Sequence, residues 1–119
     1  MLAHAKACLP NEACGYLVSD SATGQVQRFV PLTNAAGSPT RFLFEPHEQL
    51  AAEQAIDAAG EQVIGIAHSH PNGGPTPSAV SIADAGRFDP FGILVHVVIA
   101  PTAGEIRSHR IIKGEVAAI

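Results

Sequence analysis

The apolar residues follow two different repeats along the chain, and each repeat predicts a different kind of element. Over residues 47–59 they recur every three or four positions, which predicts a helix with one buried stripe that Gly60 ends. Short apolar runs bounded by Gly, Pro, Asn and Ser are typical of strands. The predicted strands cover residues 14–18, 25–32, 41–44, 63–67, 93–99 and 105–112.

Helix and turn signals separate these strands. A short helix through Leu9 ends before Pro10, because a proline pushes the residue before it out of helical geometry. Ser78 is a favourable N-cap for a helix of about ten residues. The turn clusters at residues 21–24 and 101–104 join successive strands. The order of elements predicts an α/β or α+β fold, a mixed β-sheet flanked by helices, in a single domain over residues 1–119.

Composition narrows the possible partners. The chain of 119 residues is 46% apolar and 15% charged, which argues against disorder. Seven Lys and Arg face eleven Asp and Glu without a basic run, so we expect no nucleic-acid partner. No apolar run is long enough for a membrane span, and the start lacks a signal-peptide pattern. We therefore expect a cytoplasmic protein in which Cys8 and Cys14 stay reduced. The sequence does not predict the oligomeric state.

His68 and His70 are the strongest chemical signal in the chain. Residues two apart on a strand point to the same face with Cα atoms roughly 6 to 7 Å apart, so two imidazoles can converge on one metal ion. They open onto a loop rich in Pro and Gly, where functional groups are often mounted. The other four histidines, at positions 4, 47, 96 and 109, are isolated and predicted to be surface or satisfied core residues.

A catalytic zinc site needs more than two histidines, because it keeps three protein ligands and a water molecule. The carboxylates that could supply the third ligand or a general base are Asp84, Asp89 and, from far away in the sequence, Glu12. On composition alone, Glu12 is a solvated carboxylate in the turn after Pro10, and Asp84 is an exposed acid of a helix.

The motif Glu12-Ala-Cys-Gly15, followed by His68-Ser69-His70 and then by Ser78, resembles the JAMM (MPN-plus) metalloprotease family. That family has a glutamate in E-x-x-G, then H-[S/T]-H, seven residues, a serine, two residues and an aspartate. Further matches are Asn34, Ser38-Pro39 and Phe44-Glu45-Pro46. The resemblance runs across nearly the whole chain and is greatest to the small stand-alone bacterial members.

The resemblance implies an MPN/cytidine-deaminase-like sandwich and a zinc-dependent reaction. It implies that His68 and His70 are zinc ligands and that Glu12 holds and deprotonates the zinc water. It also implies that Ser78 steadies the oxyanion, while the same residue caps the helix that follows. This division of roles is chemically consistent, since a metal, a carboxylate and a hydroxyl then serve one hydrolysis.

One position departs from the family pattern. The aspartate expected three residues after Ser78 is Ser81, and a neutral hydroxyl is a poor zinc ligand beside a carboxylate. Asp84, about one turn further along the same helix face, is the preferred candidate for the third ligand. Alternatively, Ser81-Ile-Ala-Asp84 supplies the S-x-x-D pattern in a shifted register.

By resemblance, we expect a zinc-dependent peptidase or isopeptidase acting at the C-terminal tail of a ubiquitin-like or sulfur-carrier protein. A weak or inactive binding scaffold is the alternative that Ser81 motivates. A third hypothesis is a cysteine hydrolase that uses Cys14 with a histidine. Metal content, chelators and alkylation would distinguish these three.

Overall fold

The computed structural model describes residues 1–20, 26–89 and 91–118, without the side chains at positions 79–81, 87, 88 and 118. The predicted turn at residues 21–24 and the side chain of Ser81 therefore lie outside the described part. The elements are α1 (Leu2–Cys8), β1 (Cys14–Asp20), β2 (Val26–Leu32), α2 (Pro46–Ala58), β3 (Glu61–Ser69), α3 (Ala79–Phe88), β4 (Val95–Ala100), β5 (Glu105–Ile112) and β6 (Glu115–Ala118).

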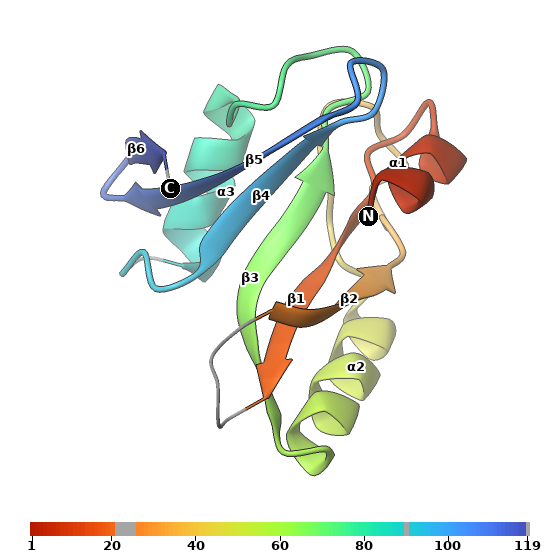
Figure 1. Ribbon diagram of the computed structural model, residues 1–119, viewed down its shortest axis with the longest axis vertical. Coiled ribbons are helices and arrows are strands. Elements are labelled where there is room, and N and C mark those ends of the chain that lie inside the picture. Colours follow the sequence, from red (N-terminus) through yellow and green to blue (C-terminus); the bar gives the residue numbers. More distant parts are fainter. Residues whose placement is uncertain (21–25, 90, 119) are drawn as a thin grey trace.

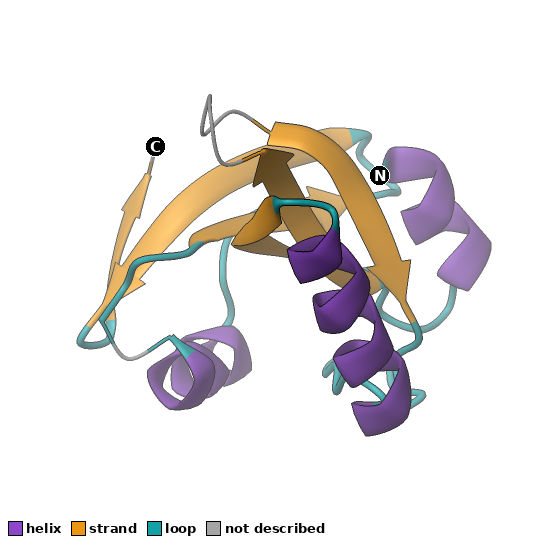
Figure 2. Cartoon of the chain, turned by 90° about the horizontal axis from the view of Figure 1, so that it is seen from below, coloured by secondary structure: helices purple, strands orange, loops and turns teal. Residues whose placement is uncertain are grey.

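Six strands form one mixed sheet in the order β2-β1-β3-β4-β5-β6 (Figure 1). The strands β3 and β4 run parallel and are connected through α3, whereas the other neighbouring pairs are antiparallel. Figure 2 shows α2 and α3 on the same side of the curved sheet. The predicted mixed sheet with flanking helices is confirmed.

Three elements differ from the prediction. Residues 41–44 form no strand, and the one ladder contact there is an isolated bridge between Asn34 and Phe44. The backbone of this loop is instead held by the side chain of Asn34, as described below. Strand β3 is longer than residues 63–67, because its polar start at Glu61 hides it from an apolar pattern. Strand β6 was not predicted, since it is short and exposed.

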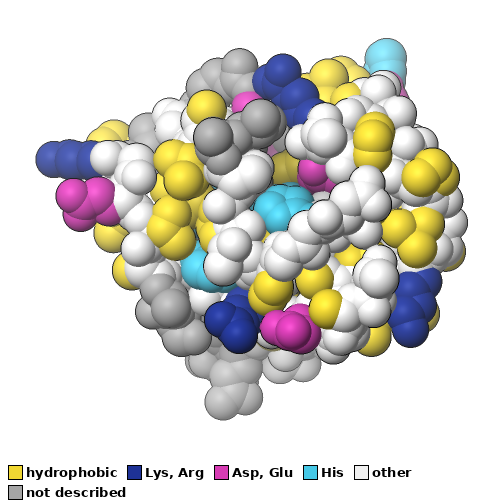
Figure 3. Space-filling model, turned by 90° about the horizontal axis from the view of Figure 1, so that it is seen from above, with side chains coloured by type: hydrophobic (Ala, Val, Ile, Leu, Met, Phe, Trp, Pro, Cys, Tyr) yellow, Lys and Arg dark blue, Asp and Glu magenta, His cyan; other side chains and the backbone are white. Residues whose placement is uncertain are grey.

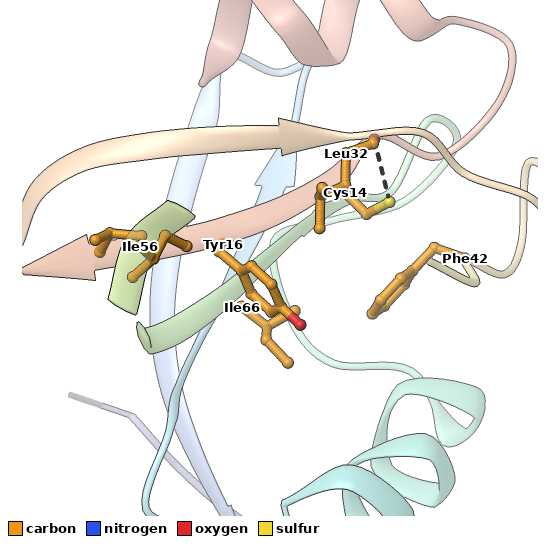
Figure 4. Packing of buried hydrophobic residues seen from close by; sticks show 7 residues of the cluster. Cys14, Tyr16, Leu32, Phe42, Ile56 and Ile66 are labelled. Atoms are coloured by element: carbon orange, nitrogen blue, oxygen red, sulfur yellow. Dashed lines mark hydrogen bonds between the residues drawn. The ribbon is translucent and has the colours of Figure 1, made fainter. Parts of the chain in front are cut away.

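The apolar core lies on both faces of the sheet. On the face that α1 covers, Ala5 packs with Leu17, Ala67 and Val97. On the opposite face, Ile56 of α2 belongs to the second cluster, which Figure 4 shows from close by. Its buried members are Cys14, Tyr16, Val18, Leu32, Phe42, Ile56 and Ile66. None of the helices in the described residues is long and apolar enough to cross a membrane.

Candidate metal centre

The ends of β1 and β3 bring the predicted site residues together. Ser69 N donates to Ala13 O over 3.0 Å, and Ala13 N donates to Ser69 Oγ over 2.7 Å. Cys14 pairs with His68 in this register, and its continuation just beyond the two strands sets Glu12 opposite His70. Because side chains alternate along a strand, Glu12, His68 and His70 share the face that α2 and α3 cover.

The two histidines converge through their Nε2 atoms, which lie 3.2 Å apart. His70 Nδ1 lies 3.1 Å from the carbonyl oxygen of Gly74, in the loop after β3. The ring of Phe42 stacks on the ring of His68, with centroids 5.0 Å apart and an interplanar angle of 25°. Burial, with smaller contributions from three neighbouring histidines, lowers the pKa of His68 to about 3. His68 is therefore a neutral imidazole at physiological pH, which is the form that binds metal.

This geometry suits a zinc ion. Two nitrogen ligands about 2.0 to 2.1 Å from a tetrahedral zinc lie about 3.3 Å apart, close to the separation of the two Nε2 atoms. A metal-ligating histidine also tends to bond through its other nitrogen, which fixes the ring orientation. The contact between His70 Nδ1 and Gly74 O has that arrangement.

Glu12 is buried beside this pair, with 3% of its surface exposed. It lines a cleft of about 240 Å³ together with Pro39, Thr40, His70, Asn72, Gly73 and Ser78. Burial and, secondarily, the negative charge of Asp84 raise the pKa of Glu12 to about 8. A carboxyl group whose pKa lies near neutrality can both accept and return a proton.

The cleft opens at the end of the molecule where β3 stops. Figure 3 looks onto that end, where histidine side chains lie in hollows of the surface among acidic and apolar ones. Ser78 is half-buried there, immediately before α3, and its carbonyl oxygen accepts from Ile82 N over 3.0 Å. Its place before α3 agrees with the predicted cap position.

Asp84 is buried on α3, close enough to Glu12 to act on its charge, but its carboxylate pairs with the side chain of Arg41. Arg41 Nη2 lies 3.2 Å from Asp84 Oδ1. Within residues 1–20, 26–89 and 91–118, no three His, Cys, Asp or Glu side chains are arranged to hold one ion. The structure therefore brings together two of the predicted ligands and leaves the third as a prediction.

Asp89, the other acidic candidate, lies elsewhere. Its carboxylate accepts from the backbone N–H groups of Ile93 and Leu94 over 2.9 and 3.1 Å. Its Oδ2 also lies 2.9 Å from Nε2 of buried His96. Asp89 thus stabilises the connection between α3 and β4, and His96 is a satisfied core residue as predicted.

Three residues that shape the site are not identified by the sequence pattern: Arg41 and Phe42 were not predicted, and Asn34 was only a motif match. Asn34 Nδ2 donates to the carbonyl oxygens of Glu12 and Arg41 over 3.1 and 3.0 Å. Its Oδ1 accepts from Ala36 N and Leu43 N over 3.0 Å each. Asn34 therefore ties the loop of residues 34–44 to the backbone of Glu12. No periodic pattern reveals Arg41 or Phe42, because neither lies on a regular element.

Close packing between β1 and β2 explains why the Glu12-x-x-Gly15 motif has a glycine at position 15. A Cβ atom at this position would collide with the carbonyl oxygen of Val30 and with the ring of Phe29. Any larger residue would push β2 away from β1, close to the strand end that carries Glu12.

Cys14 is poorly suited to be a nucleophile. Its Sγ donates to Leu32 O over 3.5 Å, and 1% of its surface is exposed. Burial, followed by neighbouring thiol and carboxylate charges, raises the pKa of this thiol to about 12. Because the thiolate is the reactive form, the structure argues against the cysteine hydrolase hypothesis.

Comparison with known proteins finds relatives whose sequences match most of this chain. Residues 1–112 match the family of prokaryotic homologues of the JAB domain. The chain is 36% identical over 116 residues to the CysO-cysteine peptidase of Mycobacterium tuberculosis, covering 98% of this chain and 79% of that protein. It is 33% identical over 87 residues to a probable TtuB-protein conjugate cleaving protease of Thermus thermophilus, covering 69% of this chain and 59% of that protein.

Solved structures agree with this relationship. A solution structure of a Desulfitobacterium hafniense protein superposes with a TM-score of 0.85 and 37% identity, covering 100% of this chain and 82% of that one. A JAB1/MPN domain protein from Archaeoglobus fulgidus shares the fold, with a TM-score of 0.60 and 20% identity over 99% of this chain and 86% of that one. The chain belongs to the family of prokaryotic homologues of the JAB domain.

Proposed function

We propose that this protein is a zinc-dependent peptidase or isopeptidase that cleaves a bond at the C-terminal tail of a ubiquitin-like or sulfur-carrier protein. The observation that carries the proposal is the convergence of His68 and His70, with Nε2 atoms 3.2 Å apart, beside buried Glu12. Membership of the JAB family supports it. So do the names of the relatives, a CysO-cysteine peptidase and a protease of TtuB-protein conjugates.

His68 and His70 would hold the zinc ion, with Asp84 as the candidate third ligand. When bound, zinc polarises the scissile carbonyl group and lowers the pKa of a coordinated water molecule to about 7. The neutral state of His68 favours this role, because a protonated imidazole cannot bind a metal.

Glu12 moves the proton. Its carboxylate accepts a proton from the attacking water and then donates it to the leaving nitrogen, so that the amine departs neutral. The raised pKa of Glu12 supports this double role, since the protonated and ionised forms are close in free energy near neutral pH. Ser78, on the wall of the same cleft, donates its hydroxyl hydrogen to the carbonyl oxygen as negative charge develops there.

The shape of the cleft favours a slender acyl group. A volume of about 240 Å³, with Gly73 in the wall, accommodates backbone with small side chains better than bulky residues. A tail that ends in glycine residues therefore fits this cleft. We assign the cleft to the acyl side of the scissile bond.

The experiment that tests the proposal uses zinc-loaded protein and a fusion in which a sulfur-carrier protein ending in Gly-Gly is extended by a peptide. Mass spectrometry follows cleavage after the tail. We expect turnover by the wild type, inhibition by a chelator and loss in the His68→Ala/His70→Ala variant. Turnover that survives both chelator and double substitution would show that the histidines are not the catalytic centre.

A binding scaffold is the second candidate, and the pairing of Asp84 with Arg41 favours it. A carboxylate engaged by an arginine is less available to a metal, and the family aspartate is replaced by Ser81. A scaffold would bind the sulfur-carrier protein in a pull-down and leave the fusion intact over long incubation with zinc. Cleavage of the fusion would reject this candidate.

A further inference from the structure

The ring of Phe42 covers one face of the imidazole of His68. The two ring centroids lie 5.0 Å apart at an interplanar angle of 25°, which is a stacked arrangement, and both side chains are buried. Aromatic rings at this separation attract each other beyond the burial of their surfaces. A tilt of the imidazole out of its plane would therefore lose a favourable contact.

The plane of this imidazole matters for the candidate metal centre. The rings of His68 and His70 are inclined at 60°, and their Nε2 atoms lie 3.2 Å apart. A nitrogen lone pair lies in the plane of its ring, so both nitrogens bind one ion only while the two planes are directed at the same point. The contact of His70 Nδ1 with Gly74 O, over 3.1 Å, restrains one of these rings. Phe42 restrains the other.

The backbone that carries Phe42 is fixed on both sides of the residue. Asn34 Nδ2 donates to Arg41 O over 3.0 Å, and Asn34 Oδ1 accepts from Leu43 N over 3.0 Å. These two contacts bracket Phe42 in the sequence. The ring therefore cannot move away from His68 unless the loop gives up its hydrogen bonds to Asn34.

The remaining surroundings of Phe42 are a second aromatic ring and a cavity. The ring of Phe44 lies 5.4 Å from that of Phe42, and it packs edge-on against Tyr16 at 5.1 Å. All three line a cavity of about 540 Å³, and Figure 4 shows Phe42 facing Tyr16 from the loop. A smaller side chain at position 42 would add the space it vacates to this cavity. His68 would then have room to tilt.

We propose that Phe42 is a positioning residue of the candidate metal centre, whose ring holds the imidazole of His68 in the plane that directs Nε2 to the ion. The inference rests on the zinc site of the proposed function and deepens it. Phe42 itself binds neither metal nor substrate, and it acts through His68. Loss of the ring should leave the ligands in place and weaken the metal that they hold.

The substitution Phe42→Leu removes the ring and keeps an apolar side chain. We expect zinc affinity, measured by titration against a competing chelator, to fall about three- to tenfold, because one aromatic contact no longer restrains the ligand. Phe42→Tyr keeps the ring, has the cavity beside it for the hydroxyl group, and should keep the wild-type affinity. If Phe42→Leu does not fold, Phe42→Met, which also lacks a ring, takes its place.

Phe44→Leu is the matched control. It makes the same change on the same loop, in the wall of the same cavity and in the same core cluster. Among the ring contacts in the described part of the chain, those of Phe44 are with Tyr16 and Phe42. Urea unfolding should show that Phe44→Leu also loses stability, yet its zinc affinity should stay within about twofold of the wild type.

Cobalt(II) gives a readout that a purely structural role would not change. Its visible absorption depends on the geometry of its ligands. At saturating cobalt we expect an altered spectrum in Phe42→Leu and the wild-type spectrum in Phe42→Tyr and Phe44→Leu. A residue that only stabilised the fold would leave the spectrum of the folded, loaded protein unchanged.

Zinc affinity and a cobalt spectrum in Phe42→Leu that equal those of the wild type would overturn the inference. So would equal losses of zinc affinity in Phe42→Leu and Phe44→Leu. Zinc affinity that depends on Phe42, in a protein that cleaves no fusion, supports the inference and rejects the peptidase. Chelator-sensitive cleavage with a zinc affinity indifferent to Phe42 supports the peptidase and rejects the inference.

Discussion

Arg41 holds the carboxylate of Asp84, with Nη2 3.2 Å from Oδ1, and thereby occupies the side chain that is the best candidate for a third zinc ligand. Asp84 is buried, so its negative charge needs a positive partner. In the described structure that partner is Arg41, and with zinc bound it would be the metal as well. Zinc affinity should therefore be weaker than in a site with an unshared carboxylate.

The substitution Ser81→Asp should strengthen zinc binding. In the usual register of the family motif, this substitution places a carboxylate at the family's ligand position, next to two imidazoles, and direct coordination should then tighten zinc about tenfold or more. Titration against a competing chelator measures the affinity. If Asp84 is the substitute ligand, Asp84→Ala should weaken zinc in the wild type and be nearly silent in the Ser81→Asp background.

The wild type, Ser81→Asp, Asp84→Ala and the double variant form a double-mutant cycle, which isolates the coupling between positions 81 and 84 in zinc affinity. The shifted register predicts the opposite pattern, in which Asp84 stays essential in both backgrounds and Ser81→Asp gives no gain. An absence of any effect at both positions would place the third ligand elsewhere.

The substitution Glu12→Gln should remove turnover and preserve the metal. Loss of a general base costs about a hundred- to ten-thousand-fold in rate, and the amide keeps the shape of the carboxyl group. Fusion cleavage measures the turnover, and elemental analysis of the same preparation measures the zinc that is retained. Unchanged turnover, or zinc lost together with activity, would contradict the assignment of Glu12 as base rather than ligand.

The pH dependence of stability in chelator-treated protein should also report on Glu12. Burial raises its pKa from 4.5 to about 8, so the folded state holds a proton that the unfolded state has lost. The free energy of unfolding should therefore fall as pH rises toward 8. The window from pH 6.5 to 8 avoids the opposing contribution of His68, whose pKa is 6.5 when unperturbed.

One proton changes stability by at most about 1.4 kcal/mol per pH unit, so the loss across this window is about 1 to 2 kcal/mol. Urea unfolding at several pH values measures it. Glu12→Gln should remove this decline relative to the wild type, and parallel profiles of the two proteins would show that Glu12 does not titrate there.

Asn34→Ala should destabilise the protein by about 2 to 4 kcal/mol, because it leaves several backbone groups of the loop and the carbonyl oxygen of Glu12 without their partner. Thermal and urea unfolding measure the loss. Gln54→Ala, an exposed substitution on α2, is the matched control and should change stability little. A loss no larger than that of the control would show that Asn34 does not organise the loop.

The sequence predicted the parts of the fold that periodicity encodes. The apolar stripe over residues 47–59 became α2, and the alternation of strand side chains correctly placed His68 and His70 on one face. The register between β1 and β3 could not be predicted, because it depends on the contact of Ser69 with Ala13 across the sheet. The motif, rather than a local pattern, suggested that Glu12 would lie beside the histidines.

The remaining site features depend on tertiary contacts. Arg41 and Phe42 lie on a loop whose shape is set by the side chain of Asn34, and no spacing rule reports such an arrangement. The segment 41–44 looks like a strand in sequence because three of its four residues are apolar, but these three line a cavity, and Phe42 also stacks on His68. The pairing of Arg41 with Asp84 joins positions that are 43 residues apart.

A zinc site formed by His68 and His70 can be measured by elemental analysis after zinc loading and exhaustive dialysis. We predict about one zinc ion per chain in the wild type and a negligible amount in the His68→Ala/His70→Ala variant. His4→Ala, at a histidine that contacts Phe29 instead, is the control and should keep the wild-type zinc content. Equal zinc content in the wild type and the double variant would show that His68 and His70 do not form a zinc site.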